Sequence, residues 1–265
     1  MRKILMATNA HYIKASAIDF SCYIANLTRS PLTGVFLENK YKPSLGGVLT
    51  TESDADEVVR ATDNAVNKHL FCNKCMRNDT RHFIQHAIGN PLNEIIRASL
   101  YADVILTDGN TSFDKNEGWP SGFVKELLKN AKCPVIVTPF DFDEINEVVF
   151  AYDGTDSSVF AMKQFIYLLP QLNDIKITVL QVLKDDDNDD ITEKNRLKEF
   201  LMMYYDAVHY DTLHGHADME LFKKFLSQRN KILVMGAYGR KKILNQSTAD
   251  ILLKTLNIPI FIAHY

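Results

Sequence analysis

Two glycines near the C-terminus, Gly236 and Gly239, follow a short apolar run and precede a predicted helix. Glycine allows the backbone to approach a ligand without obstruction from a side chain. Residues 247–250, Ser-Thr-Ala-Asp, resemble a capping box with Asp in place of the usual Glu, so they predict that a helix begins there. Free N–H groups and the dipole at such a helix N-terminus favour negative charge. This stretch therefore predicts a site for an anion such as a phosphate group.

The elements that would position this site form two copies of one pattern. Short apolar runs, typical of buried parallel strands, alternate with amphipathic helical stretches along the whole chain. The copies match best at residues 124–139 and 251–264, where a helix is followed by a proline and an apolar strand. Such alternation predicts an α/β fold with helices on both faces of parallel sheets. We predict two tandem, doubly wound, five-stranded Rossmann-like domains at residues 1–140 and 146–265, joined by an acidic segment.

In such sheets, ligands bind beyond the carboxyl ends of the strands, where the strand order reverses. This rule places Asp153, Val182 and the glycine turn around one crevice of the second copy. An adenine nucleotide fits the chemistry, because Asp153 can accept a hydrogen bond from a ribose hydroxyl or base amine, and the turn and helix can take phosphates. The predicted ligand is ATP or another adenine nucleotide, with magnesium. The predicted binding residues are Ala151, Tyr152, Asp153, Val182, Met235, Gly236, Gly239, Arg240, Ser247 and Thr248.

The composition argues against several classes of partner. A hydrophobic content of 46% and a charged content of 24% are typical of a globular protein with an ample core. The net charge of −3 gives no general attraction to nucleic acid or to anionic membranes. No apolar stretch approaches the roughly 20 residues that span a bilayer. Four cysteines are too few for a disulfide scaffold. We expect a reduced, cytoplasmic protein.

The chain resembles a tandem universal stress protein, a family with an adenine nucleotide alpha hydrolase-like fold. The resemblance is carried by AYDGTDSS at 151–158 and by the segment that runs from GAYGR at 236–240 to the strand IPIFIAH. Family members that bind ATP have Gly, two residues, Gly, nine residues, and then Gly-Ser or Gly-Thr. Gly236 and Gly239 match the first two glycines, Ser247 the hydroxyl residue, and Asp153 the acidic residue after the first strand. The resemblance implies a regulatory stress-response role.

This sequence departs from the family pattern in both copies. Only six residues, 240–245, separate Gly239 from the Gln246-Ser247 pair, and Gln246 stands where the third glycine belongs. In the first copy, Asn9 replaces the acidic residue and Asp108-Gly109-Asn110 replaces the glycine pair. Because the carboxylate of Asp108 would repel a phosphate, we predict a degenerate first site that does not bind ATP and a partly retained second site.

The resemblance also implies pairing between the final strands of two domains. Here the edges that begin at Val135 and Ile260 would pair within one chain, which removes an exposed sheet edge. We therefore predict an intramolecular pseudo-dimer; a homodimer and an unknown protein partner remain open alternatives.

Other interpretations remain beside the nucleotide site. The two glycines can simply turn the chain, Ser247 can be an N-cap, and Asp153 can cap a helix, although Asp156 already suits that role. A zinc site at Cys72 and Cys75 with His69, His82 and His86 is not expected, because a second cysteine pair is missing. No acid–base pair or activated nucleophile is evident, so we predict no catalytic residue and at most slow ATP hydrolysis. The alternatives are a nucleotide-free interaction scaffold and an adenylating enzyme of the ATP pyrophosphatase type, which residues 153–158 faintly resemble.

Overall fold

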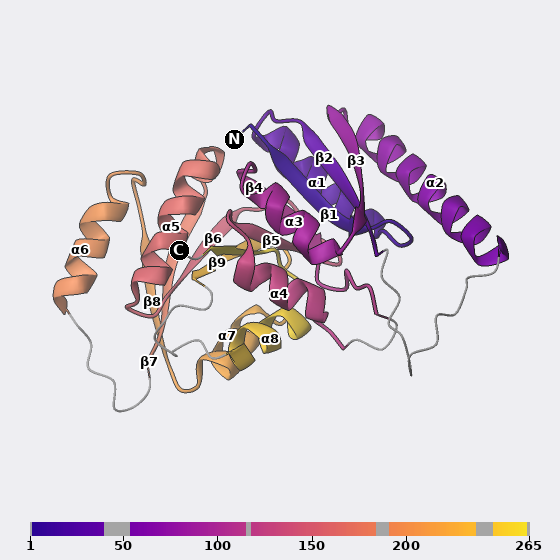
Figure 1. Ribbon diagram of the computed structural model, residues 1–265. Helices are drawn as coiled ribbons and strands as arrows, with labels where there is room; N and C mark the ends of the chain where they lie inside the picture. Colours follow the sequence, from indigo (N-terminus) through magenta and orange to yellow (C-terminus); the bar gives the residue numbers. More distant parts are fainter. Residues whose placement is uncertain (1, 40–53, 115–117, 184–190, 237–245, 264–265) are drawn as a thin grey trace. The chain divides into compact units, whose positions relative to one another are not determined.

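The computed structural model describes residues 2–39, 54–114, 118–183, 191–236 and 246–263; of residues 54–57, 191–193, 218 and 246–250 it describes the backbone alone. The chain divides into two compact units, Arg2–Cys133 and Pro134–Tyr265, which we call the N-terminal and C-terminal units (Figure 1). None of the helices in the described ranges is both long enough and apolar enough to cross a bilayer.

The N-terminal unit is a parallel sheet with helices packed against it. Its strands are β1 (Ile4–Asn9), β2 (Leu32–Asn39), β3 (His82–Gly89) and β4 (Val104–Asp108), in the order β3-β2-β1-β4. Its helices are α1 (Ala15–Leu27), α2 (Asp54–Arg77), α3 (Pro91–Ser99) and α4 (Gly122–Asn130). The strand order reverses at β1, so the edge that this topology offers to a ligand lies where β1 and β4 end.

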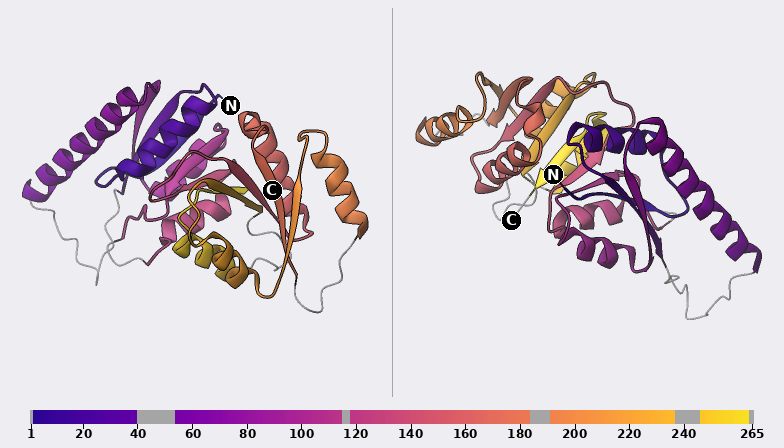
Figure 2. Two further views of the ribbon diagram at one scale, coloured as in Figure 1. Left: turned by 180° about the vertical axis from the view of Figure 1, so that it is seen from behind. Right: turned by 90° about the horizontal axis from the view of Figure 1, so that it is seen from above.

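The C-terminal unit repeats this arrangement and adds two strands at one edge (Figure 2). Its strands are β5 (Val135–Thr138), β6 (Glu147–Tyr152), β7 (Lys176–Leu183), β8 (His209–His214), β9 (Lys231–Gly236) and β10 (Ile260–Ala263), in the order β5-β10-β9-β6-β7-β8. Its helices are α5 (Asp156–Leu168), the short 3-10 helix η2 (Pro170–Leu172), α6 (Ile191–Leu201), α7 (Ala217–Phe225) and α8 (Gln246–Thr255). Here the order reverses at β6, so the corresponding edge lies where β6 and β9 end.

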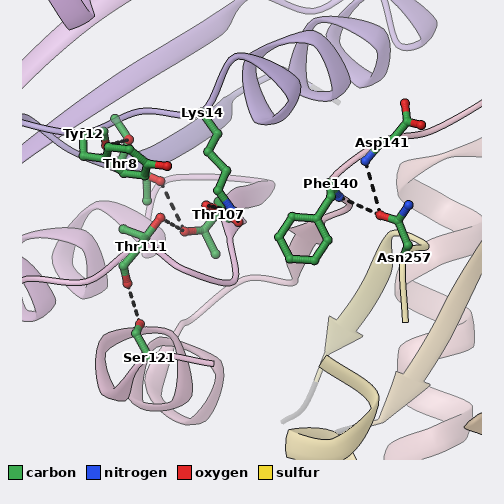
Figure 3. A network of polar contacts seen from close by, with 11 residues as sticks. Thr8, Tyr12, Lys14, Thr107, Thr111, Ser121, Phe140, Asp141 and Asn257 are labelled. Atoms are coloured by element: carbon green, nitrogen blue, oxygen red, sulfur yellow. Dashed lines mark hydrogen bonds and ion pairs between the residues drawn. The ribbon is translucent and has the colours of Figure 1, made fainter. Parts of the chain in front are cut away.

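The predicted α/β fold is confirmed, and so is the predicted pairing of the last strands. β5 and β10 pair antiparallel, with Phe261 opposite Ile136. Beyond β5, the side-chain oxygen of Asn257 accepts hydrogen bonds from the backbone N–H groups of Phe140 (2.8 Å) and Asp141 (3.2 Å) (Figure 3). Because β5 is held in this way, the compact units divide before it, at Cys133, and not at residue 140.

Helical periodicity correctly identified the buried face of α5. Met162, Phe165 and Ile166 are all at most 2% exposed. The ring of Phe165 meets Phe150 of β6 at 5.7 Å and Phe261 of β10 at 5.2 Å between centroids, in both cases edge to face. Fully burying one such side chain contributes about 1.5–3 kcal/mol. The aromatic group thus fixes α5 over the centre of the sheet.

A buried carboxylate joins three strands at their amino ends. Glu147 is 5% exposed. Its Oε1 accepts from the hydroxyl of Thr178 on β7 at 2.7 Å and lies 3.3 Å from the ammonium of Lys176, while Oε2 lies 2.7 Å from Nζ of Lys231 on β9. β6 is therefore tied to both of its neighbours at the end opposite to the predicted ligand edge.

Candidate functional site

The acidic residue after β6 is built into the turn that starts α5. Oδ1 of Asp153 accepts from the backbone N–H of Thr155 at 3.0 Å and from its hydroxyl at 2.6 Å. Thr155 is the N-cap of α5, and its Oγ1 accepts from the N–H of Ser158 at 3.3 Å. The expectation that Asp156 takes the capping role is wrong, because Asp156 is the first helical residue. Its negative charge there interacts favourably with the helix dipole.

One oxygen of Asp153 remains available. Its Oδ2 has no hydrogen-bond partner within the described part of the chain, and the side chain is half-buried at the carboxyl end of β6. Gly154, with a φ of +76°, turns the backbone directly after it. Asp153 can therefore accept a hydrogen bond from an external hydroxyl or amine while it holds the Thr155 turn.

Gly236 ends β9 at a point of very close packing. A Cβ there would lie 2.5 Å from the carbonyl carbon of Ser157 and 2.6 Å from its carbonyl oxygen, which leaves no room for any side chain. The hydroxyl of Ser157 is buried and has no partner among the described residues. The glycine is thus required by the packing of α5 against the sheet, whether or not a ligand binds.

The remaining predicted residues divide between the two faces of the sheet. Ala151 lies beside Leu180 in register, so Ala151 and Val182 share one face. Phe150 lies beside Val234, which places Met235 on the face of Ala151. Tyr152 points to the opposite face, where Phe150 meets α5. At this edge, one face of the sheet therefore carries the apolar residues Ala151, Val182 and Met235, and the other face carries Tyr152.

Four predicted residues come after β9 in the sequence. Gly239 and Arg240 lie outside the described residues. Ser247 and Thr248 lie in the first turn of α8, which begins at Gln246, two residues earlier than the capping box requires for Ser247 to be the N-cap. Their backbone therefore stands at a helix N-terminus, as predicted, but Ser247 is inside the helix.

At the equivalent edge of the N-terminal unit, the polar side chains form hydrogen bonds and an ion pair within the protein. Asn9 donates from Nδ2 to the carbonyl of Ser112 at 2.7 Å, and its Oδ1 accepts from the N–H of His11 at 2.8 Å. Asp108, 8% exposed, forms an ion pair with Lys14 at 3.0 Å. The repulsion expected from Asp108 is therefore countered by a lysine that sequence analysis did not identify.

Threonine and serine hydroxyls complete this edge (Figure 3). Thr8 donates to the carbonyl of Tyr12 at 3.3 Å, and Thr107 donates to the hydroxyl of Thr111 at 3.3 Å. Ser121, the N-cap of α4, donates in turn to the carbonyl of Thr111. Each of these groups meets its hydrogen-bonding requirement inside the protein.

The histidines and cysteines pair differently from the zinc hypothesis. Nε2 of His86 lies 2.9 Å from a carboxylate oxygen of Glu38, and Nε2 of His11 lies 3.7 Å from the other. Sγ of Cys75 lies 3.7 Å from Sγ of Cys22 on α1. Within the ranges described, no three His, Cys, Asp or Glu side chains are arranged to hold a metal ion. The parallel order of β1, β2 and β3 is the signal that could have brought His11, Glu38 and His86 together.

Burial keeps the thiols of two cysteines protonated. The hydrogen bond with Cys22, followed by burial, raises the pKa of Cys75. Burial also raises the pKa of Cys133 to about 12. Neither residue is a nucleophile at neutral pH, because the thiolate is the reactive form.

Comparisons with known proteins agree with the fold and with the resemblance. No family model matches the chain. Universal stress protein Slr1230 from Synechocystis is 28% identical over 142 residues, which is 52% of this chain and 49% of that protein, so the chain spans about half the length of its curated relative.

Two solved structures share the fold over nearly the whole chain. A universal stress protein from Archaeoglobus fulgidus superposes with a TM-score of 0.72 at 15% identity, covering 99% of this chain and 96% of that one. The functionally unknown protein PA1789 from Pseudomonas aeruginosa superposes with a TM-score of 0.61 at 14% identity, covering 98% and 92%. With its two α/β units, the chain is thus similar to universal stress proteins, over about half its length in sequence and over nearly all of it in fold.

Proposed function

We propose that this protein is a cytoplasmic regulator of a stress response that binds an adenine nucleotide at the carboxyl edge of its C-terminal unit. The observation that carries the proposal is the contrast between two equivalent edges. In the N-terminal unit, Asn9 and Asp108 are both satisfied by internal partners. In the C-terminal unit, Asp153 keeps one carboxylate oxygen without a partner among the described residues.

Each part of the edge would contribute a different contact. Oδ2 of Asp153 would accept from a ribose hydroxyl or the base amine, and the apolar side formed by Ala151, Val182 and Met235 would pack against the base. The N-terminus of α8 would face the phosphates, because its free N–H groups and dipole favour negative charge. We infer that ATP with magnesium is one such ligand, with Gly239 and Arg240 beside its phosphates. These residues hold a nucleotide and supply no general base, so hydrolysis would be slow at most.

A nucleotide-free interaction scaffold is the second candidate. Asp153 holds the capping turn of α5, and Gly236 is required by the packing of Ser157, so both residues already have structural roles. A chain that had lost nucleotide binding would retain them for these reasons alone.

A titration with a matched pair of variants separates the two candidates. Asp153→Asn keeps an oxygen for the hydrogen bonds from Thr155 and replaces the available one by an amide that cannot accept. Asp156→Asn removes an exposed charge from the same turn and serves as the control. If AMP or ATP with magnesium binds, a ligand at a hundredfold excess over its Kd stabilises the protein by about 2.7 kcal/mol. We expect the D153N protein to lose this stabilisation and the D156N protein to keep it.

The opposite results would favour the scaffold. An unchanged thermal midpoint at millimolar nucleotide, together with no heat in calorimetry, would remove the nucleotide proposal. Equal binding by the wild-type and D153N proteins would show that the nucleotide binds elsewhere.

A further inference from the structure

A cavity of the C-terminal unit lies between the sheet and helix α6. Its volume is about 190 Å³. The sheet residues follow the register of the strands, because Tyr152 lies beside Gln181, which lies beside Thr212, and Val179 lies beside Tyr210. The residues that line it are Tyr152, Val179, Gln181, Lys194, Asn195, Leu197, Lys198, Tyr210, Asp211 and Thr212.

The floor of this cavity is apolar and its rim is polar. Tyr152, Val179 and Leu197 are 6%, 3% and 5% exposed. Gln181 and Thr212 stand above this floor, and neither side chain has a hydrogen-bond partner in the part of the chain that the structure describes. An apolar pocket with a few polar groups is the usual form of a small-molecule site.

The charge at the rim is positive. Lys194 and Lys198 lie four residues apart on α6, so both stand on the same side of the helix, above the cavity. Asp211 contributes the only carboxylate among the lining residues, but strand alternation turns its side chain to the other face. There it forms an ion pair with Lys224 of α7 at 2.8 Å. Among the described lining residues, an anion at the mouth of the cavity would therefore meet the ammonium of Lys198 and no opposing carboxylate.

We propose that this cavity binds a small aromatic carboxylate with a single ring. A cavity of about 150 Å³ holds a benzene ring, so 190 Å³ admits a ring with one carboxylate. The ring would pack on Tyr152, Val179 and Leu197, while the carboxylate would reach the ammonium of Lys198. Drug-sized ligands need about 300–1,000 Å³, so a whole nucleotide does not fit. The cavity is thus separate from the nucleotide edge, although Tyr152 borders both.

The test uses the full chain without any nucleotide and compares benzoate with neutral benzamide. Ligand-observed NMR or calorimetry should show saturable binding of benzoate. Lys198→Gln should weaken benzoate about two- to fivefold, as for a partly exposed ion pair, and leave benzamide unchanged. Thr212→Trp should fill the cavity and abolish the binding of both ligands. His209→Trp adds the same bulk to the same strand outside the cavity and should bind both ligands normally.

Binding of an aromatic carboxylate in this cavity can be refuted in two ways. The proposal is wrong if benzoate shows no saturable binding below about 10 mM, the weak end for so few atoms. It is also wrong if the T212W protein, folded by its thermal midpoint, binds benzoate like the wild type. If T212W does not fold, Gln181→Glu replaces it: a carboxylate above the floor should repel benzoate and spare benzamide, and equal losses for both would overturn the proposal.

Discussion

Replacing the buried carboxylate of Glu147 should strongly destabilise the C-terminal unit. The Glu147→Gln substitution keeps an acceptor for the hydroxyl of Thr178 but leaves the ammonium of Lys231, whose side chain is 16% exposed, without its charge partner. Breaking a buried ion pair on one side costs about 3–5 kcal/mol. The second ammonium, on Lys176, is 52% exposed and adds at most about 1 kcal/mol.

The expected loss is therefore about 3 kcal/mol at neutral pH, the low end of that range, because Lys231 can still reach water. For a unit of this size, such a loss lowers the thermal midpoint by about 10 °C. Urea unfolding measures the free energy directly. The matched control is Glu126→Gln, because Glu126 is 46% exposed and its ion pair with Lys129 is a surface contact worth about 0.5 kcal/mol or less.

The pH dependence gives a second test of the same contact. Burial acts to raise the pKa of Glu147, but the hydrogen bonds from Lys231 and Thr178 outweigh it and hold that pKa below its ordinary value of 4.5. A carboxyl whose folded pKa is depressed contributes stability above its unfolded pKa and loses it as the pH falls through the folded value. The gap between the wild-type and E147Q proteins should thus be constant from pH 7 to about 5 and shrink below 4.5. A gap no larger than that of E126Q, or one unchanged at pH 3, would refute this account of Glu147.

Three further predictions concern the turns and the thiols. Gly236→Ala should cost about 1–3 kcal/mol in urea unfolding, because its Cβ would clash with the backbone of Ser157; an unchanged midpoint would contradict the close packing. Thr155→Ala should cost about 0.5–2 kcal/mol through the lost N-cap of α5, and Thr155→Ser, which keeps the hydroxyl, should restore most of it. Iodoacetamide at pH 8 should label half-buried Cys72 before Cys75 and Cys133, whose pKa values are raised; mass spectrometry that finds Cys75 labelled first would contradict the buried thiol pair.

Local patterns predicted the fold because each pattern depends on neighbours in the sequence. The stripe of Met162, Phe165 and Ile166 follows from helical periodicity alone. The proline before each closing strand marks the start of β5 and of β10, and the need to cover exposed sheet edges predicts that they pair.

The contacts at the two edges could not be predicted in the same way. Lys14 and Asp108 are far apart in sequence, and so are Glu38 and His86, so only the folded arrangement shows that each pair meets. The N-cap of α5 was predicted at the wrong residue for a more local reason. Thr155 and Asp156 are both good capping residues, and the choice depends on the backbone bend at Gly154, where φ is positive. The requirement for Gly236 likewise comes from Ser157, a residue of another element.

The most direct test of the central claim is amide chemical-shift mapping of the full chain during a titration with AMP and with ATP and magnesium. The account predicts saturable shifts at Asp153, Val182 and Gly236, with none at Asn9 or Gly109 of the N-terminal unit. Shifts confined to the N-terminal unit, or no shifts at millimolar nucleotide, would contradict it.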